Sequence, residues 1–140
     1  MDPATLAAAA GAALIGAMTT SAWQQVSSAI ARLWRRANPK RAQAIAAELE
    51  KTRTEAVAAQ AGDDAGAVSA LAASWDQRLR KLMETDPDVT AELQAVLEDV
   101  LMPVLGPADR RQVANIIMTA SASGEGRVYQ AGRDQWISGQ

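Results

Sequence analysis

The chain has 140 residues, 49% of them hydrophobic, and a formal net charge of −2, which fits one domain with a sizeable core and a short tail. It has no Cys and no His, which removes thiol nucleophiles, disulfides, imidazole bases and the common zinc and haem ligand sets. Ala, Leu, Val and Ile dominate the apolar residues, and Tyr129 is the single tyrosine, so an all-α fold is expected.

The first predicted element is one long apolar helix from Pro3 to about Arg36. No residue from Pro3 to Ala31 is charged, and Asp2 is well placed as the N-cap. The first half of this helix is apolar on all sides, whereas the second half is amphipathic. An uncharged helix of about 29 residues spans roughly 43 Å, more than the ~30 Å hydrocarbon core of a bilayer.

Two interpretations of this helix stay open. Its many small residues make membrane insertion marginal and equally suit the centre of a soluble bundle. The basic, Trp-bearing flank favours a helix that is buried at rest and inserts later, because such residues sit well at headgroups. The candidate membrane-helix residues are Leu6, Gly11, Leu14, Ile15, Gly16 and Met18, and the candidate membrane-interface residues are Trp23, Arg32, Trp34, Arg35 and Arg36.

Three amphipathic helices are expected after the break at Asn38-Pro39. The first covers 41–61, the second follows the turn at 62–64 and ends near Thr85, and the third runs from about Asp88 to the Gly106-Pro107 stop. Four helices with short connections predict a four-helix bundle, assigned to residues 1–107.

Residues 108–140 are expected to form an amyloid-forming (cross-β) or disordered tail. Between Gln112 and Ser123 β-branched and small polar residues prevail, so this part looks extended rather than helical. Further on, apolar and polar residues alternate, with Gln side chains that can form ladders between stacked strands. A last hairpin packed on the bundle is the alternative. The candidate amyloid-motif residues are Val128, Tyr129, Gln130, Ala131, Gly132, Gln135, Trp136 and Ile137.

No catalytic, cofactor-binding or metal-binding residue is predicted, and the chain is not expected to be an enzyme. Neighbouring carboxylates fall on expected helix surfaces or turns without a supporting base. These pairs are Glu48 and Glu50, Asp63 and Asp64, and Glu98 and Asp99. Nucleic acid is not an expected partner, since the chain beyond Arg41 is acidic and offers no extended basic surface.

Two segments resemble known families. Residues 126–137, GRVYQAGRDQWI, resemble the bacterial amyloid signalling motifs of actinobacteria, whose core is similar to the RIP homotypic interaction motif. Val128, Gln130 and Gly132 fall on that core pattern, whereas Ala131 stands where the animal motif prefers a branched apolar residue. Residues 1–10, MDPATLAAAA, and the helical body after them resemble the Bell domain, a bacterial cell-death effector analogous to fungal HeLo and mixed-lineage-kinase-like executioner domains.

The resemblance implies a membrane-disrupting cell-death effector in bacterial antiphage immunity. A nucleotide-binding oligomerisation-type (NLR) receptor with a matching motif would template the tail into a prion-like fibril. Clustering would then release the N-terminal helix from a cytoplasmic resting state into the inner membrane, where it would form pores. The implied partners are copies of the chain itself, the receptor and membrane lipids. Two alternatives stay open: a non-lytic helical adaptor that binds partners through its C-terminal segment, and a small helical regulator whose tail packs as a hairpin.

Overall fold

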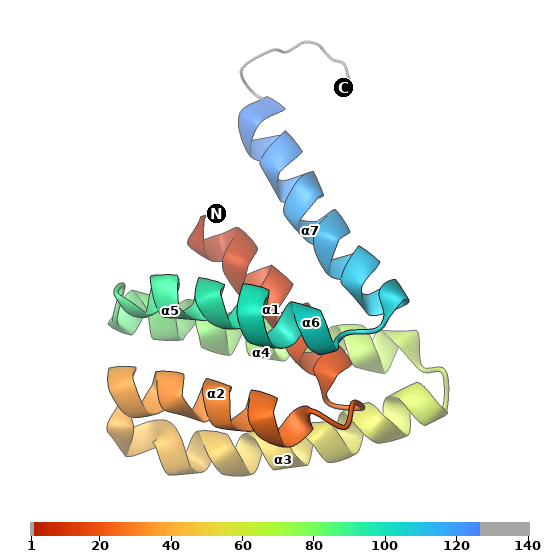
Figure 1. Cartoon of the computed structure of the whole chain (residues 1–140), viewed down its shortest axis with the longest axis horizontal. Coiled ribbons are helices and arrows are strands. Elements are labelled where there is room, and N and C mark those ends of the chain that lie inside the picture. The colour runs from red at the N-terminus through yellow and green to blue at the C-terminus, as the bar shows by residue number, and fades with distance from the viewer. Residues whose placement is uncertain (1, 127–140) are drawn as a thin grey trace.

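The structure is a computed structural model that describes residues 2–126, with side chains as far as residue 120. Over these residues the fold is all-helical, as the composition predicts (Figure 1). The elements are α1 (Pro3–Ala17), α2 (Trp23–Ala37), α3 (Pro39–Ala61), α4 (Ala65–Thr85), α5 (Val89–Val96), the π-helical turn η1 (Leu97–Leu101), α6 (Met102–Val104) and α7 (Pro107–Gly126).

Helix α1 begins where the sequence predicts, because Asp2 caps it. The Asp2 carboxylate accepts hydrogen bonds from the backbone N–H of Thr5 at 2.8 Å and from the Thr5 hydroxyl at 3.0 Å. Pro3 takes the first helical position, where its missing N–H costs nothing. The N–H of Thr5 is also the main reason why the pKa of Asp2 lies below its ordinary value of 3.8.

The expected single helix from Pro3 to Arg36 is wrong, because the chain turns between α1 and α2. The Thr19 hydroxyl donates to the carbonyl of Gly16 at 3.3 Å, and the Thr20 hydroxyl donates to the carbonyl of Ala17 at 2.7 Å. Such hydroxyl groups compete with helical backbone bonds and favour turns. The apolar segment is therefore a 15-residue helix followed by an amphipathic one, rather than one long apolar helix.

Helices α3 and α4 lie close to their predicted ranges. Pro39 starts α3, and the Asp64 carboxylate caps α4 by accepting from the N–H of Ala67 at 3.0 Å. The fourth predicted helix is a run of α5, η1 and α6 from Val89 to Val104. Its π-helical turn ends two residues before Pro103, which lacks the N–H that a regular helix needs there.

Helix α7 corrects the expectation that the chain is extended from Gln112 onward. Val113 is buried, and Ile116, Ile117 and Ala120 are half-buried, at the three- and four-residue spacing of one helix face. Packing of this face against α1 outweighs the low helix propensity of the β-branched residues. Residue 107, the predicted boundary, is the first residue of a helix that packs on α1. Together with the division of the first predicted helix into α1 and α2, this means that the all-helical fold is not the expected four-helix bundle.

The core is built around α1, which packs against α4, α7, α5, η1 and α2. In Figure 1, α1 crosses the middle of the molecule, with α2 and α3 below it, and α7 leans away toward the top. Trp34 and Trp75 meet edge to face at 6.1 Å between ring centroids, and the indole N–H of Trp75 donates to the Thr52 hydroxyl at 3.0 Å. The helical cover around α1 is what defines the candidate site.

Candidate functional site

The uncharged helix α1 is enclosed by the rest of the fold. Its surface is covered on nearly all sides. Thr5 is the one polar side chain of α1, so burying this helix leaves almost no polar side chain in need of a partner. All six predicted membrane-helix residues are buried in this conformation; they are Leu6, Gly11, Leu14, Ile15, Gly16 and Met18. The structure therefore brings the predicted membrane-helix residues together in one place, away from solvent.

Helix α4 is the tightest cover of α1. At Gly11 the two backbones touch: a Cβ atom there would lie 2.8 Å from the carbonyl oxygen of Ala72 and 3.0 Å from the backbone nitrogen of Asp76. Backbone atoms inside a helix cannot rotate away, so only glycine permits this approach. The α1–α4 contact is consequently rigid and intolerant of added volume.

Helix α7 covers α1 less tightly. A Cβ atom at Gly16 would meet only side-chain atoms, the Asp109 carboxylate at 3.1 Å and the Leu105 methyl group at 3.1 Å. A cleft of about 230 Å³ runs between α1, α4 and α7, and Asp109, Gln112 and Ile116 line its α7 side. The contact between α1 and α7 thus contains polar groups and open space, unlike the backbone contact between α1 and α4.

Arg110 ties the start of α7 to the residues just before it, 102–105. Its guanidinium donates to three backbone carbonyls, at 3.3 Å to Met102, 3.5 Å to Pro103 and 3.0 Å to Leu105. These carbonyls lie at the C-terminal end of α6, where few backbone donors are available, although the Met102 carbonyl also accepts from the N–H of Leu105 at 3.3 Å. Arg110 thus fixes where α7 leaves the bundle.

Burial on α7 gives the scale of its attachment. Val113 is 1% exposed, and Ile116 and Ile117 are half-buried. At the usual value for buried aliphatic side chains, these three contribute roughly 4 kcal/mol. These side chains are one part of what holds α7, beside the Arg110 hydrogen bonds and the close contact of Asp109 with Gly16.

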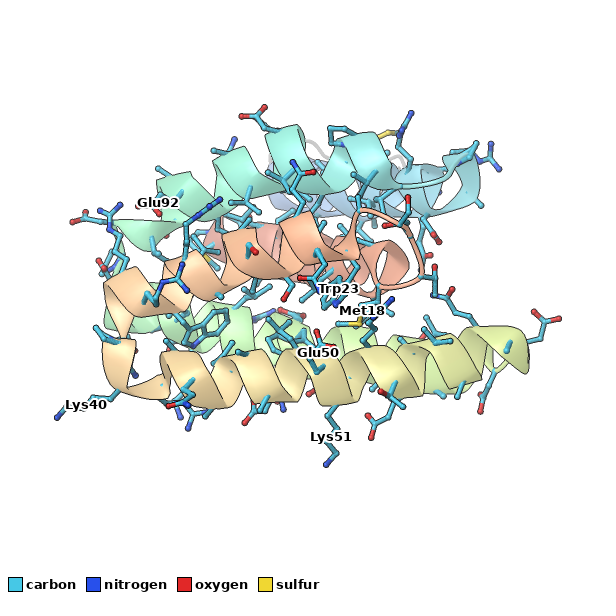
Figure 2. The ribbon with its side chains drawn as sticks, turned by 60° about the horizontal axis from the view of Figure 1, so that its bottom comes forward. Met18, Trp23, Lys40, Glu50, Lys51 and Glu92 are labelled. Atoms are coloured by element: carbon cyan, nitrogen blue, oxygen red, sulfur yellow. The ribbon has the colours of Figure 1, made fainter. Side chains whose placement is uncertain are left out.

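The C-terminal end of α1 is held from α3. The Arg53 side chain donates from Nε to the carbonyl of Met18 at 3.2 Å, and a cation there also suits the negative end of the helix dipole. Figure 2 places Met18 beside Trp23 and Glu50, where the indole N–H of Trp23 donates to the Glu50 carboxylate at 3.1 Å. Nothing in the local sequence around Met18 indicates this contact, because Arg53 lies 35 residues away.

The predicted membrane-interface residues separate into two groups. Trp23 and Trp34 are 2% and 4% exposed and belong to the core, so they do not flank the bundle surface in this conformation. Arg32, Arg35 and Arg36 are exposed on α2, and Arg36 forms an ion pair with Glu92 of α5. In this conformation the three arginines are exposed to solvent, whereas the two tryptophans are buried.

The neighbouring carboxylates serve as structural partners. Glu48 lies within ion-pair distance of Arg41 and Arg78, Glu50 accepts from Trp23, and Asp64 caps α4. Among residues 2–126 no group of three or more His, Cys, Asp or Glu side chains is placed to hold a metal ion. Three of these carboxylates thus have a structural contact, whereas Glu48 Oε1 is buried without a hydrogen-bond partner among the described residues.

The predicted amyloid-motif residues 128–137 lie outside the described residues. Their connection to the bundle is described, because α7 runs to Gly126 and the motif follows directly. Within the described chain, no helix combines the length and the apolar character that crossing a membrane requires.

Compared with protein-family models, curated proteins and solved structures, the chain matches none of them.

Proposed function

We propose that the chain is a cell-death effector whose C-terminal motif assembles into an amyloid and thereby releases α1 to disrupt a membrane. The observation that carries this proposal is the position of α7. This helix covers the uncharged α1 and also leads directly into the motif, so anything that gathers or pulls the motif acts on the cover of α1.

Assembly of the motif is the proposed trigger. In a cross-β stack, chains repeat at about 4.8 Å, which is less than the width of one helix of about 10 Å. Helices attached immediately before the motif therefore cannot all keep their resting positions beside their own bundles. Because α7 is attached to the bundle along one face and leads directly into the motif, crowding of this kind acts on α7 before it acts on the other helices. A receptor with a matching motif would start the stack.

To cross a membrane, the helix that contains α1 would have to become longer. At 1.5 Å per residue the 15 residues of α1 reach about 22 Å, short of the ~30 Å hydrocarbon core. Joined with the first turns of α2, the uncharged segment Pro3 to Ala31 reaches roughly 43 Å. The joining straightens the turn at Met18–Ala22, which breaks its local hydroxyl-to-carbonyl bonds and its contact with Arg53. It also withdraws Trp23, Val26 and Ile30 of α2 from the core.

A non-lytic adaptor is the second candidate, and the length of α1 favours it. As it stands, α1 is too short to cross the hydrocarbon core, and its burial equally suits a permanent core helix. In this role the motif still assembles and recruits partners, while the bundle stays closed.

Dye leakage from anionic liposomes distinguishes the two roles. The full chain is allowed to assemble, followed by thioflavin fluorescence, and then mixed with the liposomes. Gln130→Asp and Gly132→Asp bring repeated like charges into the stack and should abolish both assembly and leakage, whereas Ser138→Asp, outside the motif core, adds the same charge and should retain both. Assembly without leakage would establish the adaptor, and leakage by the Gln130→Asp chain would refute amyloid triggering.

A further inference from the structure

Three cationic side chains gather around a cleft between the end of α2, the start of α3 and the end of α4. Arg41 comes from α3, and Arg78 and Lys81 come from α4. The cleft has a volume of about 230 Å³, and Trp34, Ile45 and Leu82 also line it. The cations therefore surround a hollow with partly apolar walls, and they do not simply project from a convex surface.

Arg78 is fixed before any ligand arrives. Its Nη1 donates to the Ser74 hydroxyl at 2.8 Å, its Nε lies 3.1 Å from Glu48 Oε1, and its guanidinium carbon is 4.6 Å from the centre of the Trp75 ring. These contacts hold a long side chain in one conformation, so little further entropy is lost when it binds an anion. Arg78 is thus a pre-organised cation at the cleft.

Arg41 and Lys81 are not neutralised to the same degree. Arg41 Nη2 is 3.7 Å from Glu48 Oε2, a long and half-exposed pair of the kind that contributes little to stability. Across residues 2–120 no carboxylate lies within 4.0 Å of the Lys81 ammonium group. Glu48 is the only carboxylate paired with these three cations in that part of the chain, which leaves a local excess of two positive charges.

Arg41 also lies at a position where a positive charge is unfavourable. It lies in the first turn of α3, next to Lys40, where the helix dipole disfavours cations. A purely structural role requires only the tie between Arg78 and Glu48 that joins α4 to α3, and it leaves the other two cations without a function. An anion in the cleft would relieve their mutual repulsion.

We propose that this cleft binds a phosphate group. Its volume is below the 300–1,000 Å³ of pockets that enclose whole small molecules, so it admits a phosphate and the few atoms attached to it. Arginine matches phosphate oxygens with paired N–H donors, and lysine adds a mobile point charge. The phosphate is carried either by a small soluble monoester or by a lipid headgroup, and the site is independent of the role proposed for α1.

The test uses the full chain and its amide ¹H–¹⁵N spectrum. Glycerol phosphate is titrated at fixed ionic strength, with Asn38 and Thr85 as reporters because both line the cleft. Lys81→Gln and Arg41→Gln remove cleft cations; Lys51→Gln is the control, since Lys51 is equally exposed on α3 and points away from the bundle in Figure 2. A second titration uses vesicles of phosphatidylcholine with and without phosphatidic acid.

Saturable shifts at Asn38 and Thr85 are expected, with an affinity about tenfold weaker in Lys81→Gln and in Arg41→Gln and unchanged in Lys51→Gln. Saturation by glycerol phosphate assigns the site to a soluble monoester. Saturation by phosphatidic acid vesicles alone, with the same dependence on Lys81 and Arg41, assigns it to a headgroup. No saturable shift with either probe, or an equal loss in Lys51→Gln, would overturn the proposal.

Discussion

Replacing Gly11 by alanine tests how closely α1 and α4 approach each other. A Cβ atom at Gly11 would lie 2.8 Å from the Ala72 carbonyl oxygen and 3.3 Å from the Asp76 Cα. Alanine gains up to about 1 kcal/mol of helix propensity, but overpacking a core costs about 1–3 kcal/mol. The nearest atoms all belong to the α4 backbone, so the clash is removed only if the two helices move apart. We therefore expect an overpacking cost in the upper half of this range, about 2–3 kcal/mol.

The expected net effect of Gly11→Ala is a loss of about 1–2 kcal/mol in the free energy of unfolding. For a chain of this size that lowers Tm by roughly 3–7 °C, measurable by far-UV circular dichroism. Gly66→Ala is the matched control, because its Cβ would meet only Asp64 Oδ1 at an ordinary 3.6 Å. It should gain about 0.5 kcal/mol. If Gly11→Ala raised Tm as Gly66→Ala does, the backbone contact between α1 and α4 would be refuted.

Three further predictions concern the core, the α7 cover and the first cap. Thr52→Val removes the acceptor of the buried Trp75 indole N–H and should cost about 1–3 kcal/mol in urea unfolding, whereas an unchanged midpoint would contradict the hydrogen bond. Val113→Ala should speed amide exchange along α7 while leaving α3 protected, and equal acceleration in both would show that α7 does not open separately. The Asp2 carboxylate, whose pKa is depressed chiefly by the N–H of Thr5, should titrate below 3.8 by NMR. Because the folded pKa is the lower one, the cap stabilises α1 above pH 3.8 and is lost as the pH falls through the folded value; a midpoint at or above 3.8 would contradict it.

Helices whose ends are defined by local chemistry could be predicted from sequence. Asp2 and Asp64 are capping residues at the positions where α1 and α4 begin, and Pro39 opens α3. Each of these signals acts within three residues of the helix end, so no knowledge of the tertiary fold is needed.

The turn after α1 and the helix α7 depend on contacts that are distant in sequence. The turn relies partly on Arg53, which reaches Met18 across the bundle, and an uncharged run gives no sign of it. The composition of residues 112–123 favours an extended segment, although Val113 and Ile116 already have the spacing of a buried helix face. Tertiary packing on α1 decides between these two local preferences.

The candidate site was predictable in its residue types but not in its arrangement. An uncharged segment with small residues indicates a helix that lies against other helices, and Gly11 and Gly16 are indeed points of close approach. Which helix covers which side follows only from the fold. The tryptophans illustrate the limit, since amphipathic spacing on α2 fits a membrane interface and a protein core equally well, and Trp23 and Trp34 lie in the core.

The most direct test of the proposed release of α1 is a reversible lock between α1 and α7. A Cβ atom at Gly16 would lie 3.2 Å from Asp109 Cγ, close to the roughly 3 Å that separates one Cβ from the far sulfur of a disulfide. The chain has no cysteine of its own, so Gly16→Cys with Asp109→Cys gives a single defined cross-link. The measurement is liposome leakage by assembled chains, with each single variant as a control. The proposal predicts thioflavin-positive assembly without leakage when the lock is oxidised, and leakage restored by reductant. Equal leakage from the oxidised and reduced forms would contradict release of α1 from beneath α7.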